Sequence, residues 1–165
     1  MNPSRMLTVA LAAGLVGATV EMVFVLPIQA FGLRHAPEVV LQSIAAGALG
    51  RAAFSGGLAS ALLGVAVHAL ISVVAAGVYV LAAVRWTVLL SRPVAGGIIF
   101  GALVYGMMNF VVIPLSAIGF QMPPSLGLAL LSFSVHLFAF GLPIALVVRA
   151  MAARAPGPNA LPQRP

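Results

Sequence analysis

The residues of this sequence that could carry out chemistry are few, and they lie inside its most apolar stretches. The carboxyl group of Glu21 and the imidazoles of His68 and His136 each interrupt a long apolar run. Such ionisable groups are costly in a bilayer, so they normally face the interior of a helical bundle and have partners there. With polar neighbours at helical spacing, they predict an intramembrane polar site of six residues: Glu21, His68, Ser72, Tyr105, Asn109 and His136.

This polar site has two interpretations. Its groups could bind a ligand or move protons, or they could only join the helices together by hydrogen bonds. Hydrolysis has little support, because Ser72 follows His68 at i, i+4 spacing but no acid completes the pair. We therefore expect a protein that is not an enzyme and has no catalytic residue and no metal site. The sequence contains no cysteine, which excludes a disulfide, a thiolate metal site and covalently attached haem.

The two histidines occupy the same place in a repeated decapeptide. Residues 61–70 read ALLGVAVHAL and residues 129–138 read ALLSFSVHLF, with histidine eighth in each. Two further similar stretches, FVLPIQAFG at 24–32 and VVIPLSAIG at 111–119, precede them in the same order. The chain is therefore predicted to be two tandem helical hairpins related by a pseudo-two-fold axis along the membrane normal. That axis would bring the two imidazoles together, about 16 Å below the outer helix ends and near the midplane.

The residues around these groups favour close helix packing. Gly97 and Gly101 form a small-xxx-small motif of the kind that lets membrane helices approach each other. Glu21 and Asn109 precede the two matching prolines at similar distances, so the repeat predicts that they lie at similar heights. Those heights are about 8 to 9 Å below the outer helix ends.

Composition places these hairpins in a membrane. The chain is 62% hydrophobic and 6% charged, whereas soluble domains have about 25% charged residues. The first apolar run could be a cleaved signal peptide, but it carries Glu21 and lacks a convincing A-x-A cleavage site. A span needs about 20 apolar residues, and the charge-free stretches hold four of them. We expect an all-α integral membrane protein in which residues 1–150 form one domain of four transmembrane helices, at about 6–27, 57–84, 94–118 and 125–149.

The arginines predict the orientation and the partners. Six arginines fall on one side of the spans, and Arg34 and Arg51 fall on the other, which places both termini in the cytoplasm by the positive-inside rule. Their scatter gives no basic face for nucleic acid. The expected partner is the lipid bilayer, in which the chain could form a homo-oligomer or join a larger membrane complex.

Two segments outside the spans have their own predicted roles. The outer loop 33–56 is apolar enough to contain a short interfacial helix that starts near Pro37, and this helix could cover the outer mouth of the bundle. The Pro-rich segment 151–165 is predicted to be a disordered cytoplasmic tail.

Several motifs resemble those of a known family. The stretch RAAFSGG, the histidine of the second span and the stretch MNFVVIPLS in the third are similar to a family of small four-span bacterial inner-membrane proteins with no known activity. The resemblance covers about residues 6–150. It implies four spans and a bacterial inner membrane, and it assigns no functional residue.

Three functions are compatible with these features. The best supported is a small transport or permeation unit, without a cofactor, whose ligand meets the intramembrane polar site. The first alternative is an electron carrier in which His68 and His136 ligate a b-type haem from its two faces. The second alternative is a non-catalytic scaffold or accessory subunit, for which helix packing alone suffices.

Overall fold

The computed structural model describes residues 1–120 and 125–153, which are largely helical and include no β-strand. Four helical segments are long and apolar enough to cross a membrane: Pro3–Gly32, Gly57–Arg85, Pro93–Leu115 and Leu126–Ala153. The prediction of an all-helical chain with four apolar spans, consistent with a multi-pass membrane protein, is confirmed at this level. The tandem repeat and its pseudo-two-fold axis stay predictions.

Three of these segments contain a π-helical turn, and the loop after the first segment contains an α-helix that begins at Pro37, where the sequence predicts one. In chain order the elements are α1 (Pro3–Pro27), π-helix η1 (Ile28–Gly32), α2 (Pro37–Leu49), 3-10 helix η2 (Gly50–Ser55), α3 (Gly57–Arg85), α4 (Val88–Ser91), α5 (Pro93–Met107), π-helix η3 (Met108–Val112), α6 (Ile113–Leu115), α7 (Leu126–Val135), π-helix η4 (His136–Gly141) and α8 (Leu142–Ala153).

Caps and prolines set the helix starts. The side chain of Asn2 accepts a hydrogen bond from the Arg5 amide at 3.0 Å, and that of Ser125 accepts one from the Leu128 amide at 3.2 Å. Both α2 and α5 begin with a proline, at a position where the missing N–H would have no helical partner. The end of α2 is set by Gly50, whose φ of 61° favours glycine.

Each π-helical turn lies next to a proline. Proline lacks the N–H that the helical ladder needs, and its ring clashes with the carbonyl four residues earlier. The turn η1 directly follows Pro27, and η3 and η4 end two residues before Pro114 and Pro143. Because a π-helical turn holds one residue more than an α-helical turn, it can absorb this misfit, and each segment stays helical past its proline.

The ends of the first and third spans differ from the predicted ones. The first span continues to Gly32 instead of ending at residue 27, because η1 carries the helix past Pro27. The third span ends at Leu115 instead of residue 118, because Ser116 has an extended backbone with ψ of 170°. The C-terminal end of the first span is therefore one turn farther from Glu21 than the sequence predicts.

The fourth span is longer than predicted. It reaches Ala153, so residues 151–153 are helical, although the sequence predicts that they begin a disordered tail. One Nη atom of Arg5 donates to the carbonyl of Met151 at 2.8 Å and so ties this last turn to the start of α1. The rest of the predicted tail, 154–165, lies outside the described residues.

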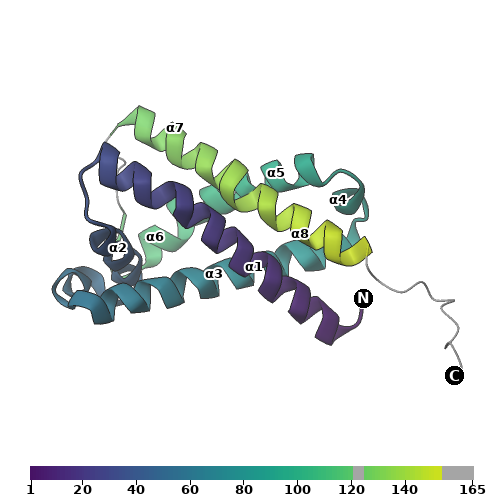
Figure 1. Cartoon of the computed structure of the whole chain (residues 1–165), viewed down its shortest axis with the longest axis horizontal. Coiled ribbons are helices and arrows are strands. Elements are labelled where there is room, and N and C mark those ends of the chain that lie inside the picture. The colour runs from purple at the N-terminus through teal and green to yellow at the C-terminus, as the bar shows by residue number, and fades with distance from the viewer. Residues whose placement is uncertain (121–124, 154–165) are drawn as a thin grey trace, which may run out of the picture.

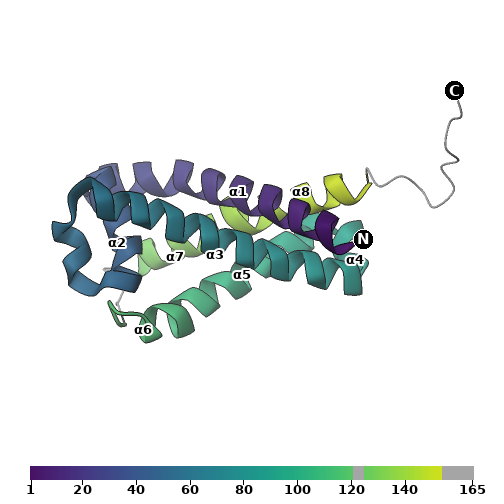
Figure 2. The same ribbon diagram turned by 90° about the horizontal axis from the view of Figure 1, so that it is seen from below.

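The four spans do not pack as a closed square. α1 packs against α3 on one side and against η4 and α8 on the other, and α5 packs on the far side of η4 and α8. The remaining pair, α3 and α5, touch through the edge-to-face rings of Tyr79 and Phe100, whose centroids are 5.0 Å apart. From there the two helices diverge toward the end where α2 and α6 lie (Figure 2).

The two ends of the bundle differ in packing. The start of α1 and the end of α8 lie together at one end, opposite to α2 (Figure 1). The larger apolar core lies toward this terminal end and comes mostly from α1, α3 and α8, and its fully buried members include Val9, Ala13, Ala76, Tyr79, Val80, Ile144, Ala145 and Val148. A smaller cluster of Ala45, Ala46 and Ala53 lies in α2 and η2. The opposite end, where α2 lies, is called the α2 end below.

Glycines bring the backbones of α5 and η4 into contact. A Cβ atom at Gly101 would overlap the carbonyl oxygen of His136 and would lie 2.8 Å from the Cα of Leu137. A Cβ atom at Gly97 would lie 2.8 Å from the Cα of Leu142. The two small residues therefore allow the close approach that the sequence predicts for them, and this approach brings the backbone of His136, at the start of η4, directly against α5.

Candidate functional site

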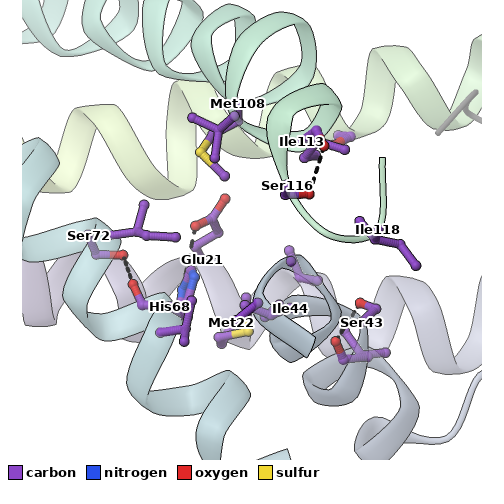
Figure 3. Close-up of a pocket in the computed structure, with 18 of the residues that line it drawn as sticks. Glu21, Met22, Ser43, Ile44, His68, Ser72, Met108, Ile113, Ser116 and Ile118 are labelled. Atoms are coloured by element: carbon purple, nitrogen blue, oxygen red, sulfur yellow. Dashed lines mark hydrogen bonds and ion pairs between the residues drawn. The ribbon is translucent and has the colours of Figure 1, made fainter. Parts of the chain in front are cut away.

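One carboxyl group and two imidazoles from the middle of the spans meet in one cluster. Glu21 comes from α1, His68 from α3 and His136 from the first position of η4. Nε2 of His68 lies 3.7 Å from Oε2 of Glu21, and Nε2 of His136 lies 3.5 Å from Oε1. Glu21 is only 5% exposed, and Figure 3 shows it beside His68. Each oxygen of one buried carboxyl group is thus approached by a separate imidazole.

The members of this Glu21–His68–His136 cluster lie at matching depths along their spans. Eleven residues separate Glu21 from Gly32, and the same number separates His68 from Gly57, at the α2 end of each span. His136 lies ten residues from Leu126. At 1.5 Å per residue these distances are about 15 to 16 Å, which is half the thickness of a bilayer core of about 30 Å.

The imidazoles have backbone partners that decide where their hydrogens lie. Nδ1 of His136 is 2.9 Å from the carbonyl oxygen of Ser132, and Nε2 of His68 is 3.3 Å from that of Ala18. A carbonyl oxygen can only accept, so each of these ring nitrogens carries a hydrogen. In neutral His136 the Nε2 that faces Glu21 is then an acceptor. Two acceptors face each other across 3.5 Å, and a proton or an external donor is needed between them.

The cluster lies at the inner end of a cavity of about 870 Å³. The residues that line it on α1 and η1 run from Glu21 to Gln29, and those on α3 run from Ser72 to Val67. On each helix, therefore, the lining starts near the cluster and continues toward the α2 end. In the other direction the helices close on the apolar core. The cavity thus reaches the cluster from one end of the bundle.

The helix α2 forms part of the wall of this cavity. Ser43, Ile44 and Gly47 of α2 line it, and Figure 3 shows the first two across from Ser116. α2 can lie this close to α3 because Gly64 has no side chain: a Cβ atom there would overlap the carbonyl oxygen of Leu41. The helix predicted in the loop 33–56 is therefore docked over the cavity.

The other predicted site residues have different positions. Ser72 is 1% exposed, lines the cavity and donates its hydroxyl to the His68 carbonyl at 2.8 Å. Tyr105 stands edge-on to the His136 ring with centroids 5.2 Å apart, and its hydroxyl donates to the Ala129 carbonyl at 3.4 Å. It therefore supports the ring of His136 from the side.

Asn109 does not join the cluster. Its amide donates to the Tyr105 carbonyl one turn earlier, at 2.9 Å, and it does not line the cavity. It lies six residues, or about 9 Å, before the end of its span at Leu115, whereas Glu21 lies about 16 Å from Gly32. The predicted distance of Glu21 from the end of its helix, about 8 to 9 Å, is therefore too short, because η1 lengthens the first span.

The structure adds polar residues to the site that the sequence did not single out for it. Gln29, Ser43, Arg51, Ser116 and Ser132 all line the cavity. Ser132 precedes His136 by four residues, so helical spacing could have indicated it. The others come from the α2 side of the molecule, and their position depends on how α2 and η2 dock.

The cluster holds no recognisable metal-ligand set. Among residues 1–120 and 125–153, no group of three or more His, Cys, Asp and Glu side chains has an arrangement that could hold a metal ion. A haem iron bound by both histidines would lie between the two Nε2 atoms, whereas here each Nε2 faces its own oxygen of Glu21. The haem alternative stays a prediction.

Comparisons of this chain with models of protein families, with curated proteins and with solved structures found no match in any of the three. The resemblance to a four-span bacterial family therefore also stays a prediction.

Proposed function

We propose that this chain is a small transport unit of the bacterial inner membrane and that its ligand binds at the Glu21–His68–His136 cluster. One observation carries the proposal: Glu21 is 5% exposed, yet it lines a cavity of about 870 Å³. An ionisable group at this depth is costly. A group that served only to join helices would be expected to be enclosed by its partners and to have no face on a cavity.

The one-sided cavity favours a transporter over an open channel. A channel would need a polar path through the terminal end, where the apolar core lies. In a transporter the site opens to one side at a time, and parts of the bundle rock against each other around it. The small contact between α3 and α5 offers such a joint, because α5 could move relative to α3 without breaking a large interface.

The distribution of arginine supports the proposed orientation. Arg5, Arg85, Arg92 and Arg149 belong to helix ends and turns of the terminal end, and Arg34 and Arg51 belong to the α2 end. With both termini in the cytoplasm, the cavity would open to the outside. Four spans are few for alternating access, so we also propose that the working unit is a homo-oligomer or part of a larger membrane complex.

The test is flux into sealed proteoliposomes. Protons are followed with an entrapped pH dye under a potassium diffusion potential, and Na⁺ and hexadecylammonium are followed as labelled solutes. The matched control is Glu38→Gln, because Glu38 is the only other acidic residue of the chain, is exposed, and accepts a hydrogen bond from Gln42 that a glutamine side chain can also accept. We expect the wild type and Glu38→Gln to carry at least one of these species equally, and Glu21→Gln to carry it at least ten-fold more slowly.

Equal flux in Glu21→Gln, or no flux of any of these species, would reject the transport proposal. The two alternatives have separate signatures. An absorption band of haem in protein purified from haem-supplied cells, lost in His68→Ala and His136→Ala, would favour the electron carrier. Loss of a co-purifying subunit in the same variants, without flux or a haem band, would favour the scaffold.

A further inference from the structure

A second cavity, of about 690 Å³, lies between α3 and α5, where these helices diverge. Its walls are apolar side chains such as Val74 and Val78 from α3 and Ile99 and Leu103 from α5, and it contains no charged residue. Val74 and Val78 are more than half exposed, so this is an open groove on the side of the bundle. In a membrane, this groove would face the hydrocarbon chains of lipid.

The groove adjoins the polar cavity. Four side chains line both of them: Ile71 from α3 and Val104, Met108 and Val112 from the segment of α5 and η3. All four are apolar, and Met108 is unbranched and flexible enough to change rotamer without a movement of the backbone. A molecule with a polar head and an apolar chain could therefore place its head in the cavity and its chain in the groove.

The cluster selects the chemistry of such a head. Glu21 offers a carboxyl group, and the Nε2 of neutral His136 faces it as a second acceptor 3.5 Å away. An ammonium group carries a positive charge and several N–H donors, so it can donate to both at once. A phosphate or sulfate head has only acceptors to offer this pair. The floor of the cavity is thus complementary to a cation with N–H groups.

The direction of the groove agrees with a lipid-like molecule. From Ile71, beside the cluster, the groove follows α3 to Trp86 at the terminal end. These residues are fifteen apart, or about 22 Å, which is longer than half of a bilayer core of about 30 Å. A molecule bound with its head at the cluster and its chain in the groove has the same orientation as a lipid in the leaflet on the α2 side. Its head lies deeper than the head of such a lipid by about half the thickness of the bilayer core.

We propose that the ligand of the site is a single-chain amphiphile with a primary ammonium head, which enters sideways from the bilayer through the gap between α3 and α5. This proposal deepens the transport function and rests on the same site. The head lies between Glu21 and His136, and the chain lies in the groove and ends near Trp86.

Trp86 is the only tryptophan of the chain and lies at the far end of the groove, so it can report the position of the chain end. The probe is hexadecylammonium with bromine on its last carbon, added to full-length protein in phosphatidylcholine nanodiscs. Bromine quenches tryptophan only at contact. A free amphiphile keeps its chain end near the midplane, whereas the bound one is expected to reach Trp86. We expect saturable quenching, and at least ten-fold weaker apparent affinity for the alkyl sulfate of the same length.

Three variants separate the head site from the groove. Glu21→Gln is expected to weaken the apparent affinity for the brominated ammonium probe at least ten-fold. Val78→Phe narrows the groove and is expected to reduce quenching of Trp86. Leu81→Phe is the matched control on the same helix, because Leu81 and Val78 are similarly exposed, at 59% and 57%, but only Val78 lines the groove.

Equal affinity for the ammonium and sulfate probes, equal quenching in Val78→Phe and Leu81→Phe, or quenching that never saturates would each overturn the proposal. A disulfide between two copies of Val78→Cys, formed without saturable quenching, would make the groove a subunit interface and would also overturn it. Flux that depends on Glu21 without saturable quenching would reject only the amphiphile. Saturable, Glu21-dependent quenching without any flux would reject transport and leave the ligand in place.

Discussion

Replacing Gly101 with alanine tests the packing that positions His136. The Cβ atom of alanine would overlap the His136 carbonyl oxygen and lie 2.9 Å from the carbonyl carbon. These are backbone atoms, so no rotamer change can make room, and α5 must move away from η4. Gly106→Ala is the matched control on the same helix, because no heavy atom of residues 1–120 and 125–153 lies within 4 Å of a Cβ atom there.

The size of the effect follows from the difference between these two sites. Both substitutions replace glycine within a helix, and this alone favours alanine by about 0.5–1 kcal/mol. Only Gly101→Ala adds an overlap with a packed backbone, which costs about 1–3 kcal/mol. Because the helix preference is common to both, Gly101→Ala is expected to be about 1–3 kcal/mol less stable than Gly106→Ala. Gly106→Ala itself is expected to be as stable as the wild type or slightly more so.

The assay is reversible unfolding of the detergent-purified protein in a denaturing detergent, followed by helical circular dichroism. The same variants are then compared in the proteoliposome flux assay, where displacement of His136 from Glu21 is expected to lower the flux of Gly101→Ala only. Equal unfolding free energies for the two alanine variants would refute the close crossing of α5 and η4, and with it the reason given for the position of His136.

Three further predictions concern α2, Glu21 and the topology. Gly64→Ala is expected to push α2 off α3 and to make the loop cleavable by protease, whereas Gly77→Ala, whose Cβ would meet only an alanine side chain at 3.9 Å, leaves it protected. The free energy of unfolding of Glu21→Gln is expected to lie within about 1 kcal/mol of the wild-type value, because the glutamine amide can donate to Nε2 of His136. A loss of more than about 2 kcal/mol would show that the carboxyl group has a structural role. The chain has no cysteine of its own, so single cysteines can report the topology. Ser4→Cys is expected to react with an impermeant maleimide only in opened cells, whereas Ser55→Cys is expected to react in intact cells as well. The reverse pattern would invert the proposed orientation.

The four apolar spans are the part of this structure that sequence reasoning predicts well. It also groups Glu21, His68 and His136 in one polar site, but it places Glu21 at a shallower depth than the histidines, whereas the structure brings all three together. Long charge-free runs define the spans with little dependence on tertiary contacts, and the cost of an ionisable group in lipid directs it toward the bundle interior. The distance of Glu21 from the end of its helix could not be derived, because the π-helical turn after Pro27 adds a turn of helix beyond the proline. No periodicity of the apolar residues indicates such a turn.

The polar residues of the cavity mouth could not be predicted for a different reason. Arg51 carries a strong sequence signal, but that signal concerns the orientation in the membrane. Its place in the cavity lining depends on the contact of α2 with Gly64 of α3. The sequence patterns of these two segments do not indicate that contact. A sequence therefore indicates which residues need partners, while the docking of a loop helix decides which space those partners enclose.

The division of the bundle into a packed end and an open end gives the site its character. Stability resides in the apolar core of α1, α3 and α8 at the terminal end, which contains none of the cluster residues. Regions that move or bind ligands are drawn from the less stable parts of a structure. Here the cluster lies at the boundary: its three helices are anchored by the core on one side, and the divergence of α5 leaves space on the other. Tighter packing of α5 against α3 is therefore expected to stabilise the protein and to close the site.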